Sequence, residues 1–368
     1  MNILGENYFF TGFPGFICNQ LIREILQRRP MAGIVYMLVL PHMKEKAQEE
    51  LTRIARETGR NEWQFQIIEG DITKAGLGIQ DKDVEVLKSA VTHVFHLAAV
   101  YDLAVPREIA WRVNVEGTRN VNEWVKVLQH IKRYTYFSTA YVAGRREGTL
   151  LETELIHPSE FKNHYEETKY EAEVLVEQLK RDVPTTIIRP GIVKGHSKTG
   201  ETIKFDGPYF IMNFLDRLRF LPFIPRLGNS DAEINLVPVD YIIAATAFLA
   251  FLDKGEGKTY HLTDPSPYTV SEIYEMVMKE LLGKKPTGTL PLGLAKASLM
   301  VPAVRRLLGV EKEALEYFTW KGRFDCSQAG EDLLGSGISC PDFKNGIAAM
   351  AEFYSKNKQN PDYQLKIV

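Results

Sequence analysis

Short apolar runs alternate with amphipathic segments along the first two hundred residues of the chain. Six of these runs are typical of buried strands: NYFF, GIVYMLVL, WQFQIIEGD, HVFHLAA, RYTYFST and TTIIRPG. The segments between them repeat apolar residues at helical spacing, as at Ile17, Leu21 and Ile25. Apolar strands that alternate with helices are typical of a parallel sheet covered on both faces. The pattern therefore predicts an α/β fold with a doubly wound parallel (Rossmann) sheet.

The alternation ends near residue 195. A polar, glycine-rich stretch, GHSKTGETIKFDGPYF, predicts a loop, and the later segments are mostly helical, with short strands at INLVPV and KTYHLTD. The run YIIAATAFLAFL is too short to span a bilayer and predicts a buried helix. We expect a dinucleotide-binding domain over residues 1–195, to which 229–265 contributes late elements. Residues 196–368 would form a smaller, mostly helical substrate-binding region over the carboxyl edge of the sheet.

Composition excludes several classes of function. The formal net charge of −2 over 368 residues gives no basic footprint for nucleic acid. The three cysteines are far apart, which excludes a disulfide framework and suits a reducing cytoplasm. No basic start or long apolar run suggests a signal peptide, so we expect a cytoplasmic protein. The eight histidines show no HExxH pairing, and His96 lies in an apolar strand as a core residue would, so no metal site is expected.

A glycine-containing turn, TGFPGFICN, follows the first predicted strand. Gly12 and Gly15 suit the tight turn and the close backbone approach that a pyrophosphate requires at a helix N-terminus. Cys18 stands where many such loops have a third glycine, and as a small residue it would still let the helix pack. A plain strand-to-helix turn is the alternative, since short glycine motifs are prone to false positives. Cys18 has no basic neighbour and is expected to be buried rather than nucleophilic.

The end of the second predicted strand bears on the choice of cofactor. Folds that prefer NAD place an acidic residue there to hold the ribose hydroxyls. Here the sequence is LVLPHMKEK, with no carboxylate before Glu45 and with His42, Lys44 and Lys46 nearby. We therefore expect NADP(H) to be preferred over NAD(H). The lysines could equally be the solvated face of a helix.

Tyr165 and Lys169 lie four residues apart on one face of a predicted helix. The reference pKa of tyrosine is about 10, and a nearby cation favours the phenolate. We expect the ammonium, together with the positive nicotinamide ring, to lower the pKa of this phenol towards neutrality. A tyrosine tuned in this way can give a proton to a carbonyl oxygen as hydride reaches the carbon.

Position along the chain distinguishes Tyr165 from two further Tyr-x-x-x-Lys patterns, at Tyr317 and Tyr354, for which packing or surface roles are expected. The fifth predicted strand ends in FSTAYVAG, so hydroxyls would lie at the carboxyl edge beside the phenol. Thr139, or Ser138 next to it, would bind the substrate oxygen and share its developing charge. Either hydroxyl could instead satisfy backbone groups at the strand end.

At this point the sequence resembles the extended short-chain dehydrogenase/reductase family. The matching stretches, in the order typical of the family, are TGFPGFI, GDIT, FHLAAVYDL, NVEGTRNV, FSTAYVAG, YEETK, RPGIVKG and VPVDYI. Within that family TGFPGFI, STAYVAG and RPGIVKGHSKTGE are most similar to the thioester reductase and fatty acyl-CoA reductase branch. That branch often has an arginine before the proline that follows the second strand, and here the residue is Leu40.

The resemblance implies a role for each matching residue. Asp71 and Ile72 would lie beside the adenine, Ala98 and Ala99 under the cofactor, and Asn114 would support the active-site helix and a proton-relay water. Thr139, Tyr165 and Lys169 would be the catalytic set, and Tyr165 and Lys169 would also contact the cofactor. The other cofactor contacts would come from the glycine turn, the end of the second strand and the RPG turn: Thr11, Gly12, Phe13, Pro14, Gly15, Phe16, Ile17, His42, Lys44, Pro190, Gly191 and Val193.

Three functions follow from this set of residues. The first is NADPH-dependent reduction of a fatty acyl thioester to aldehyde or alcohol. The second uses the same groups on a ketone, an aldehyde, a hydroxysteroid or a nucleotide-sugar; arginines such as Arg217, Arg219 and Arg226 would suit the sugar. The third is a non-catalytic dinucleotide sensor, which would tend to lose the tyrosine or the lysine.

The partners expected from the sequence are a small apolar carbonyl substrate and no nucleic acid. The stretch LPLGLAKASLMVPAVRRLLG could form an acyl tunnel or rest on a membrane surface, or be a helical pair that packs in the core and is broken at Pro302. A homodimer is left open.

Overall fold

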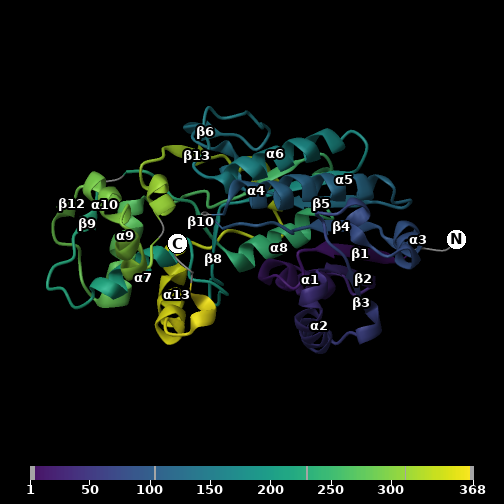
Figure 1. The fold of residues 1–368 in the computed structure, drawn as a ribbon, viewed down its shortest axis with the longest axis horizontal. Coiled ribbons are helices and arrows are strands. Elements are labelled where there is room, and N and C mark those ends of the chain that lie inside the picture. The colour runs from purple at the N-terminus through teal and green to yellow at the C-terminus, as the bar shows by residue number, and fades with distance from the viewer. Residues whose placement is uncertain (1–4, 103–104, 229–230, 311, 365–368) are drawn as a thin grey trace.

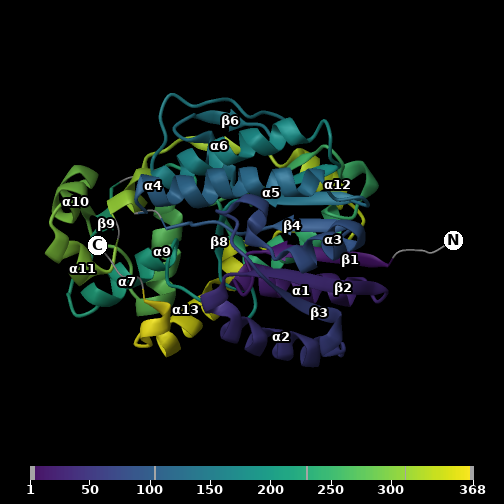
Figure 2. The same ribbon diagram turned by 45° about the vertical axis from the view of Figure 1, so that its right-hand side comes forward.

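The computed structural model describes residues 5–102, 105–228, 231–310 and 312–364. Residues 1–4, 103–104, 229–230, 311 and 365–368 lie outside them, and so do the corresponding parts of the predicted domain ranges. Through the molecule runs a parallel sheet of seven strands (Figures 1 and 2). In spatial order the strands are β11 (Thr259–Leu262), β7 (Thr185–Pro190), β5 (Arg133–Phe137), β4 (His93–His96), β1 (Glu6–Thr11), β2 (Ala32–Val39) and β3 (Phe65–Glu69).

Helices cover both faces of this sheet, as the predicted doubly wound fold requires. One face packs against α1 (Phe16–Arg28), α2 (Lys44–Thr58) and α8 (Val239–Leu249). The opposite face packs against α3 (Asp81–Ala90), α5 (Gly117–Lys126) and α6 (His164–Leu179). The α/β fold class is confirmed. The seventh strand, β11, comes from the predicted short strand KTYHLTD, beyond the point where the alternation ends.

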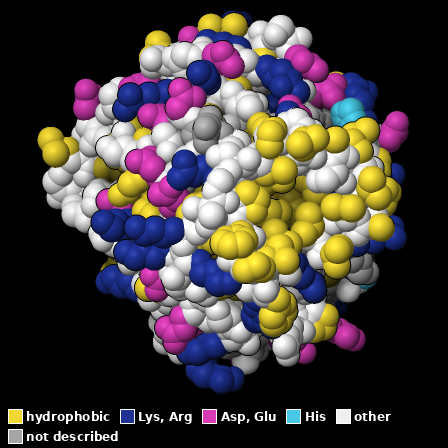
Figure 3. All heavy atoms as spheres, turned by 90° about the vertical axis from the view of Figure 1, so that its left-hand side faces the viewer, with side chains coloured by type: hydrophobic (Ala, Val, Ile, Leu, Met, Phe, Trp, Pro, Cys, Tyr) yellow, Lys and Arg dark blue, Asp and Glu magenta, His cyan; other side chains and the backbone are white. Residues whose placement is uncertain are grey.

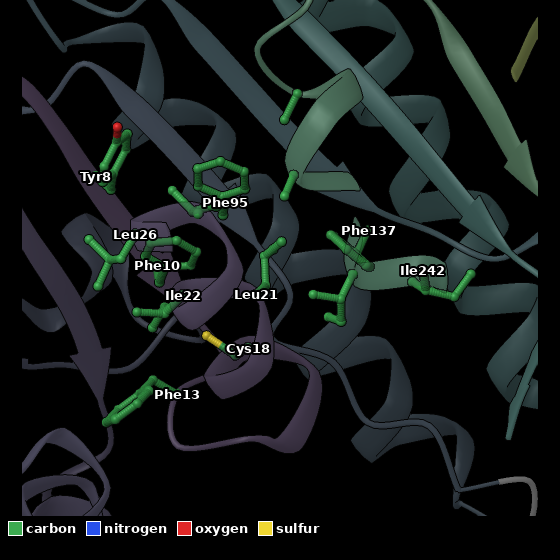
Figure 4. Close-up of a cluster of buried hydrophobic side chains, with 14 of the residues drawn as sticks. Tyr8, Phe10, Phe13, Cys18, Leu21, Ile22, Leu26, Phe95, Phe137 and Ile242 are labelled. Atoms are coloured by element: carbon green, nitrogen blue, oxygen red, sulfur yellow. The ribbon is translucent and has the colours of Figure 1, made fainter. Parts of the chain in front are cut away.

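Cys18 packs in the core between α1 and the sheet (Figure 4). Its side chain is 2% exposed and lies among Phe10, Phe13 and Leu21. Phe10 of β1 and Phe95 of β4 stack with ring centroids 4.7 Å apart and hold these central strands together. Burial raises the pKa of the Cys18 thiol. The residue in the third glycine position is therefore a small core residue, as expected, with an inert thiol.

A smaller body, which we call the cap, lies beyond the carboxyl ends of the strands, at the left of Figure 1. Its helices are α7 (Tyr209–Leu218), α9 (Val270–Leu282), α10 (Leu292–Leu299), α11 (Pro302–Leu308) and α13 (Phe343–Asn357). Three two-stranded parallel ladders accompany it: β8 (Ile192–Lys194) with β10 (Leu236–Pro238), β9 (Arg226–Leu227) with β12 (Thr289–Leu290), and β6 (Gly148–Leu150) with β13 (Gly322–Phe324). The domain boundaries remain a prediction. Helix α12 (Ser327–Leu333), which falls in the predicted substrate-binding region, packs against α8 and β11, which were expected to belong to the dinucleotide-binding domain.

From β1 the strand order runs to β2 and β3 on one side of the sheet, and from β4 it runs to β5 and β7 on the other side. The gap between the carboxyl ends of the parallel strands β1 and β4 is therefore the switch point where such folds bind ligands. Within the described ranges, none of the helices is both long enough and apolar enough to cross a membrane.

Candidate active site

A cavity of about 1010 Å³ opens at this switch point and continues into the cap. One end lies at the glycine turn, the middle passes Tyr165, and the far end lies among the cap helices. Most of the predicted site residues line it: Thr11, Gly12, Phe13, Pro14, Gly15, Phe16, Ile17, His42, Asp71, Ile72, Ala98, Ala99, Ser138, Thr139, Tyr165, Lys169, Pro190, Gly191 and Val193. Lys44 and Asn114, both predicted site residues, do not line it.

The glycine turn has the form of an anion cradle. Gly12 has φ +95°, and a Cβ there would lie 2.9 Å from the backbone nitrogen of Ala98. A Cβ on Gly15 would lie 2.6 Å from the carbonyl oxygen of Gly12. Helix α1 begins at Phe16 with no side chain capping its first turn, so its free N–H groups remain available to a ligand. The cradle fits the pyrophosphate of a dinucleotide.

The end of the cavity beyond this turn would hold the adenosine half of such a cofactor. Leu40, His42 and Met43 line it after β2, and Asp71 lines it after β3. The Asp71 carboxylate accepts hydrogen bonds from Thr73, from the backbone nitrogen at 2.9 Å and from the hydroxyl at 2.8 Å. The Lys44 ammonium instead pairs with Glu69 at 2.6 Å on the exposed surface. The structure therefore does not bring Lys44 into the cavity, because a carboxylate on the neighbouring strand holds it.

Tyr165 lies in the first turn of α6, where Asn163 caps the helix by accepting a hydrogen bond from the backbone nitrogen of Glu166 at 2.9 Å. Its hydroxyl hydrogen-bonds the Thr139 side chain at the end of β5. One turn later, the Lys169 ammonium donates to the carbonyl oxygen of Phe137 at 2.6 Å and to the hydroxyl of Tyr136 at 2.9 Å. The phenol, the threonine and the lysine thus meet at the carboxyl end of β5.

The direction of the tyrosine pKa differs from the expectation. Burial raises the pKa of Tyr165, the hydrogen bond with Thr139 lowers it, and the nearby Glu166 carboxylate raises it further. Burial also lowers the pKa of Lys169 to about 7, against the opposing effect of the Glu173 carboxylate. The amine of Lys169 is buried and held by Phe137 and Tyr136, and burial dominates the pKa of the phenol in this structure. The lowering expected from the lysine together with the nicotinamide ring stays a prediction. A neutral phenol is the form that can donate a proton.

The hydrogen bonds of Ser138 and Thr139 distinguish the roles of these two hydroxyls. The Ser138 hydroxyl donates to the buried Glu173 carboxylate, which also accepts from Arg189 Nε at 2.8 Å. Among the described residues, the Thr139 hydroxyl is not bonded to a buried carboxylate. Its oxygen accepts a hydrogen bond from the Tyr141 backbone nitrogen at 3.3 Å, and its side chain contacts the Tyr165 hydroxyl. Of the two hydroxyls that the sequence left open, Thr139 is the one beside the phenol.

This difference predicts opposite outcomes for two neighbouring substitutions. Thr139→Val should lower kcat of the reduction by about 100-fold, because one donor to the substrate oxygen is lost. Ser138→Ala should leave kcat within about threefold but lower the free energy of unfolding by about 1–3 kcal/mol, because the Glu173 oxygen loses a buried partner. Steady-state kinetics and denaturant unfolding measure the two effects. Thr139→Ser, which keeps the hydroxyl, is the matched control, and a reversed pattern would contradict the assignment.

A chain of buried polar groups links the glycine turn to Lys169. His96 Nδ1 lies 2.7 Å from the Thr11 hydroxyl, and its Nε2 lies 3.0 Å from the Thr118 hydroxyl. Thr118 also hydrogen-bonds Tyr136, which accepts from Lys169. Burial lowers the pKa of His96 to about 3, so the ring is neutral. His96 is thus the core residue expected from the sequence, and its ring contacts Thr11, which lines the cavity, and the buried Thr118.

Asn114 is buried in a π-helical turn (Trp111–Glu116) between α4 (Arg107–Ala110) and α5. Its side-chain oxygen accepts from the backbone nitrogen of Val100 at 2.8 Å, and its amide donates to the carbonyl oxygen of Val100 and to the Thr168 hydroxyl, both at 3.0 Å. These contacts fix the loop after β4 against α6, which agrees with support of the active-site helix. Its part in a proton relay remains a prediction.

Next to Tyr165, Glu166 is fully buried and turns away from Thr139 towards the C-terminal part of the chain. Its carboxylate accepts a hydrogen bond from the Tyr317 hydroxyl at 2.7 Å and pairs with Lys162 at 3.5 Å. The Lys162 ammonium lies 4.1 Å from the ring centroid of Trp320. Burial raises the pKa of Glu166, and the Lys162 ammonium and the Tyr317 hydroxyl counteract it. Tyr317, in the second of the three Tyr-x-x-x-Lys patterns, therefore has the packing role expected of it.

Other cavity residues were missed by the sequence analysis. Tyr101, Lys204 and Asp206 line the cavity from two loops. The Lys204 ammonium lies 5.2 Å from the ring centroid of Tyr101, and burial raises the pKa of Asp206 to about 6. For Lys204 and Asp206 the available signal was the polar loop GHSKTGETIKFDGPYF, whose pattern does not show which side chains face inward; Tyr101 lies in the matching stretch FHLAAVYDL. The apolar far end was expected only in part. The stretch LPLGLAKASLMVPAVRRLLG, named as a possible acyl tunnel, supplies Ala295 and Leu299 to the wall, but the residues of α7 that complete it were not expected.

Comparisons with known proteins agree with this geometry. A family model described as Male sterility protein, for an NAD-binding family, matches residues 10–246. The chain is 26% identical over 277 residues to fatty acyl-CoA reductase wat of Drosophila melanogaster, covering 65% of this chain and 53% of that protein. It is 29% identical over 296 residues to the non-canonical nonribosomal peptide synthetase FrzA of a Cladobotryum species, covering 76% and 28%. The chain spans about half the length of the fatty acyl-CoA reductases it matches.

Solved structures show the same similarity over more of the chain. The terminal R domain from the myxalamid PKS-NRPS biosynthetic pathway aligns with a TM-score of 0.81 and 26% identity, covering 100% of this chain and 93% of that one. MoeE5 in complex with UDP-glucose and NAD aligns with a TM-score of 0.63 and 19% identity, covering 96% and 100%. The second similarity concerns the fold alone.

Proposed function

The chain belongs to the NAD-binding family described as Male sterility protein, within the extended short-chain dehydrogenase/reductases, and from this premise we propose that it is an NADPH-dependent reductase of fatty acyl thioesters. The observation that carries the proposal is the shape of the cavity, which runs from the glycine turn past Tyr165 into an apolar chamber. The chamber walls come from cap residues Phe210, Phe214, Leu227, Leu290, Ala295, Leu299, Leu308 and Phe318. Burying an acyl chain there would contribute about 0.8 kcal/mol per methylene.

The residues at the centre of the cavity suit a thioester carbonyl. A bound dinucleotide would supply the hydride that reduces the carbonyl carbon. Thr139 and Tyr165 would hydrogen-bond the carbonyl oxygen as it gains negative charge, and Tyr165 would then give it a proton. The resulting hemithioacetal loses its thiol to leave the aldehyde, and a second reduction would give the alcohol. No acyl-enzyme is required, which agrees with the inert thiol of Cys18.

The environment of the β2 end supports NADPH over NADH. The residues that line the cavity there are Leu40, His42 and Met43, so no carboxylate from this strand end meets the ribose. A 2′-phosphate would meet His42 rather than a negative charge, which is the electrostatic situation that favours NADP(H).

The nucleotide-sugar alternative needs polar groups in the substrate chamber. No arginine is among the described residues that line the cavity. Arg226 pairs with Glu275 and Arg219 with Asp216, away from the substrate position. A non-catalytic sensor is disfavoured because Thr139, Tyr165 and Lys169 come together at one site. A homodimer and contact with a membrane remain predictions from the sequence.

Following NADPH oxidation with a substrate panel tests the proposal. The panel contains acyl-CoAs of increasing chain length, the matching aldehydes, a ketosteroid and UDP-glucose, and release of free CoA thiol is measured in parallel. We expect turnover and stoichiometric thiol release with long-chain acyl-CoA, and a preference of at least about tenfold for NADPH over NADH. Turnover of ketones or sugars without any thioester would reject the assignment in favour of the second function.

A further inference from the structure

Large apolar side chains are concentrated on one surface of the cap. Their exposed fractions reach 81% for Phe220, 67% for Phe223, 69% for Met300 and 66% for Leu307. Together with Leu221, Leu294 and Val301 they form what we call the collar. Figure 3 shows this face, on which apolar side chains surround a hollow. An exposed apolar patch of this kind on a soluble surface usually marks an interaction site.

The collar comes from two segments distant in sequence that the fold brings together. Phe220 to Phe223 follow α7, and the remaining residues belong to α10, α11 and their connection. The β9–β12 ladder pairs Leu227 with Leu290 and joins the two segments, and α11 contacts α7 directly. Leu221 of the collar lines the cavity, and so does Ser298, which lies between Leu294 and Met300 in the sequence, so the collar adjoins the cap end of the cavity that passes Tyr165. The geometry points to the hollow on this face as the mouth of the substrate chamber.

Basic side chains are held directly behind these apolar tips. The Arg219 guanidinium lies 4.6 Å from the ring centroid of Phe220. The Lys284 ammonium donates to the carbonyl oxygens of Arg219 at 3.0 Å and Leu221 at 3.2 Å. Arg305 donates to the carbonyl oxygen of Leu299 at 3.0 Å, beside Met300. The acidic groups close by are paired: Asp216 with Lys358 at 2.6 Å and with Arg219 itself at 3.2 Å, and Glu316 with Lys296 at 3.1 Å.

We propose that the collar docks the protein onto an anionic lipid bilayer, with the chamber mouth facing the acyl region. Apolar tips with cations immediately behind them are the arrangement that lies in a membrane interface, where the cations meet anionic headgroups. The centre of the patch favours a bilayer over a protein partner. A protein interface is packed most densely at its centre, whereas here the centre is an opening that mobile acyl chains could enter. The proposal goes beyond the reductase function, because it holds for any apolar ligand of the chamber.

Vesicle co-sedimentation of the full chain, without substrate, tests the docking. We expect binding to vesicles of phosphatidylcholine with one third phosphatidylglycerol and clearly weaker binding to phosphatidylcholine alone. The Phe220→Ser/Phe223→Ser variant should lower the vesicle partition coefficient at least about tenfold, because two apolar tips no longer insert. Lys285→Gln/Arg306→Gln, which changes exposed cations next in sequence to Lys284 and Arg305, should remove the preference for anionic vesicles.

Matched controls are available on other surfaces of the chain. Met31 and Leu334 are 88% and 86% exposed but lie outside the collar, so Met31→Ser/Leu334→Ser should bind vesicles like the wild type. The collar variants should also keep turnover of a water-soluble short-chain thioester, which separates loss of docking from failure of the proposed reductase activity. The proposal is overturned if the wild type does not bind vesicles or if the control variant loses binding equally. A concentration-dependent dimer that Phe220→Ser/Phe223→Ser abolishes, or binding of an acyl carrier protein in place of vesicles, would also overturn it.

Discussion

Replacing Tyr165 with phenylalanine is expected to lower kcat of the reduction by about 100- to 10,000-fold, the contribution of a positioned proton donor. The hydroxyl meets Thr139 where the cavity passes the end of β5, and it stays protonated because burial raises its pKa. The ring itself remains in Tyr165→Phe, so the cavity wall keeps its shape. Cofactor binding, measured by fluorescence titration with NADPH, should change by less than about threefold, because the glycine turn that would hold the pyrophosphate is unaffected.

Tyr354→Phe provides the matched control for this result. Tyr354 also has a lysine four residues later, but it is buried in the cap and its hydroxyl donates to Asn213 at 2.9 Å. Its loss should cost about 1 kcal/mol of unfolding free energy and leave kcat unchanged. If Tyr165→Phe turned over substrate at the wild-type rate, the assignment of the proton donor would be refuted.

Narrowing the apolar chamber is expected to shorten the accepted acyl chain. Ala295 of α10 is 5% exposed and lines the cavity, so Ala295→Trp places an indole inside the chamber. We expect kcat/KM for long-chain acyl-CoA to fall at least about 100-fold, which is about 2.7 kcal/mol, or the burial of three to four methylenes. Short-chain acyl-CoA should lose less than about threefold. A chain-length series of kcat/KM values measures the shift.

Ala297→Trp, on the exposed side of the same helix and outside the lining, controls for the effect of the indole on folding. Ser298→Trp gives a second narrowing at a position that is exposed and still lines the cavity, in case Ala295→Trp overpacks the core. An equal loss for short and long chains in both narrowing variants would mean that the acyl chain does not occupy the chamber.

The sequence predicts the elements that depend on local pattern. Continuous apolar strands between amphipathic helices predict the doubly wound sheet, and Gly59 ends α2 in the left-handed conformation typical of a helix C-terminus. The glycine turn and the Tyr165–Lys169 spacing are also local, and the structure places both at the cavity. A motif of a few residues can be predicted from the sequence because its geometry is fixed within one turn or one helix.

What the sequence cannot predict are the contacts between distant segments. The direction of the Tyr165 pKa depends on burial and on Thr139, 26 positions earlier in the chain. The amine of Lys169 is turned towards β5 by Tyr136 and Phe137, which no helix pattern indicates. Lys44 pairs with Glu69, a residue of the neighbouring strand β3 that lies 25 positions later in the chain. The chamber likewise exists only because cap helices meet across the ladder of β9 and β12.

The bond between Tyr317 and Glu166 has a consequence for the evolution and redesign of this protein. Tyr317 lines the cavity and at the same time satisfies a buried carboxylate adjacent to Tyr165, the proposed proton donor. Exchanging the C-terminal segment for that of a relative with another specificity would leave this acid without its partner and strain the turn that aims the phenol. The exchanged protein would then have the new substrate specificity but a lower catalytic rate, unless a hydroxyl is retained at position 317. The C-terminal segment and helix α6 must therefore change together in evolution.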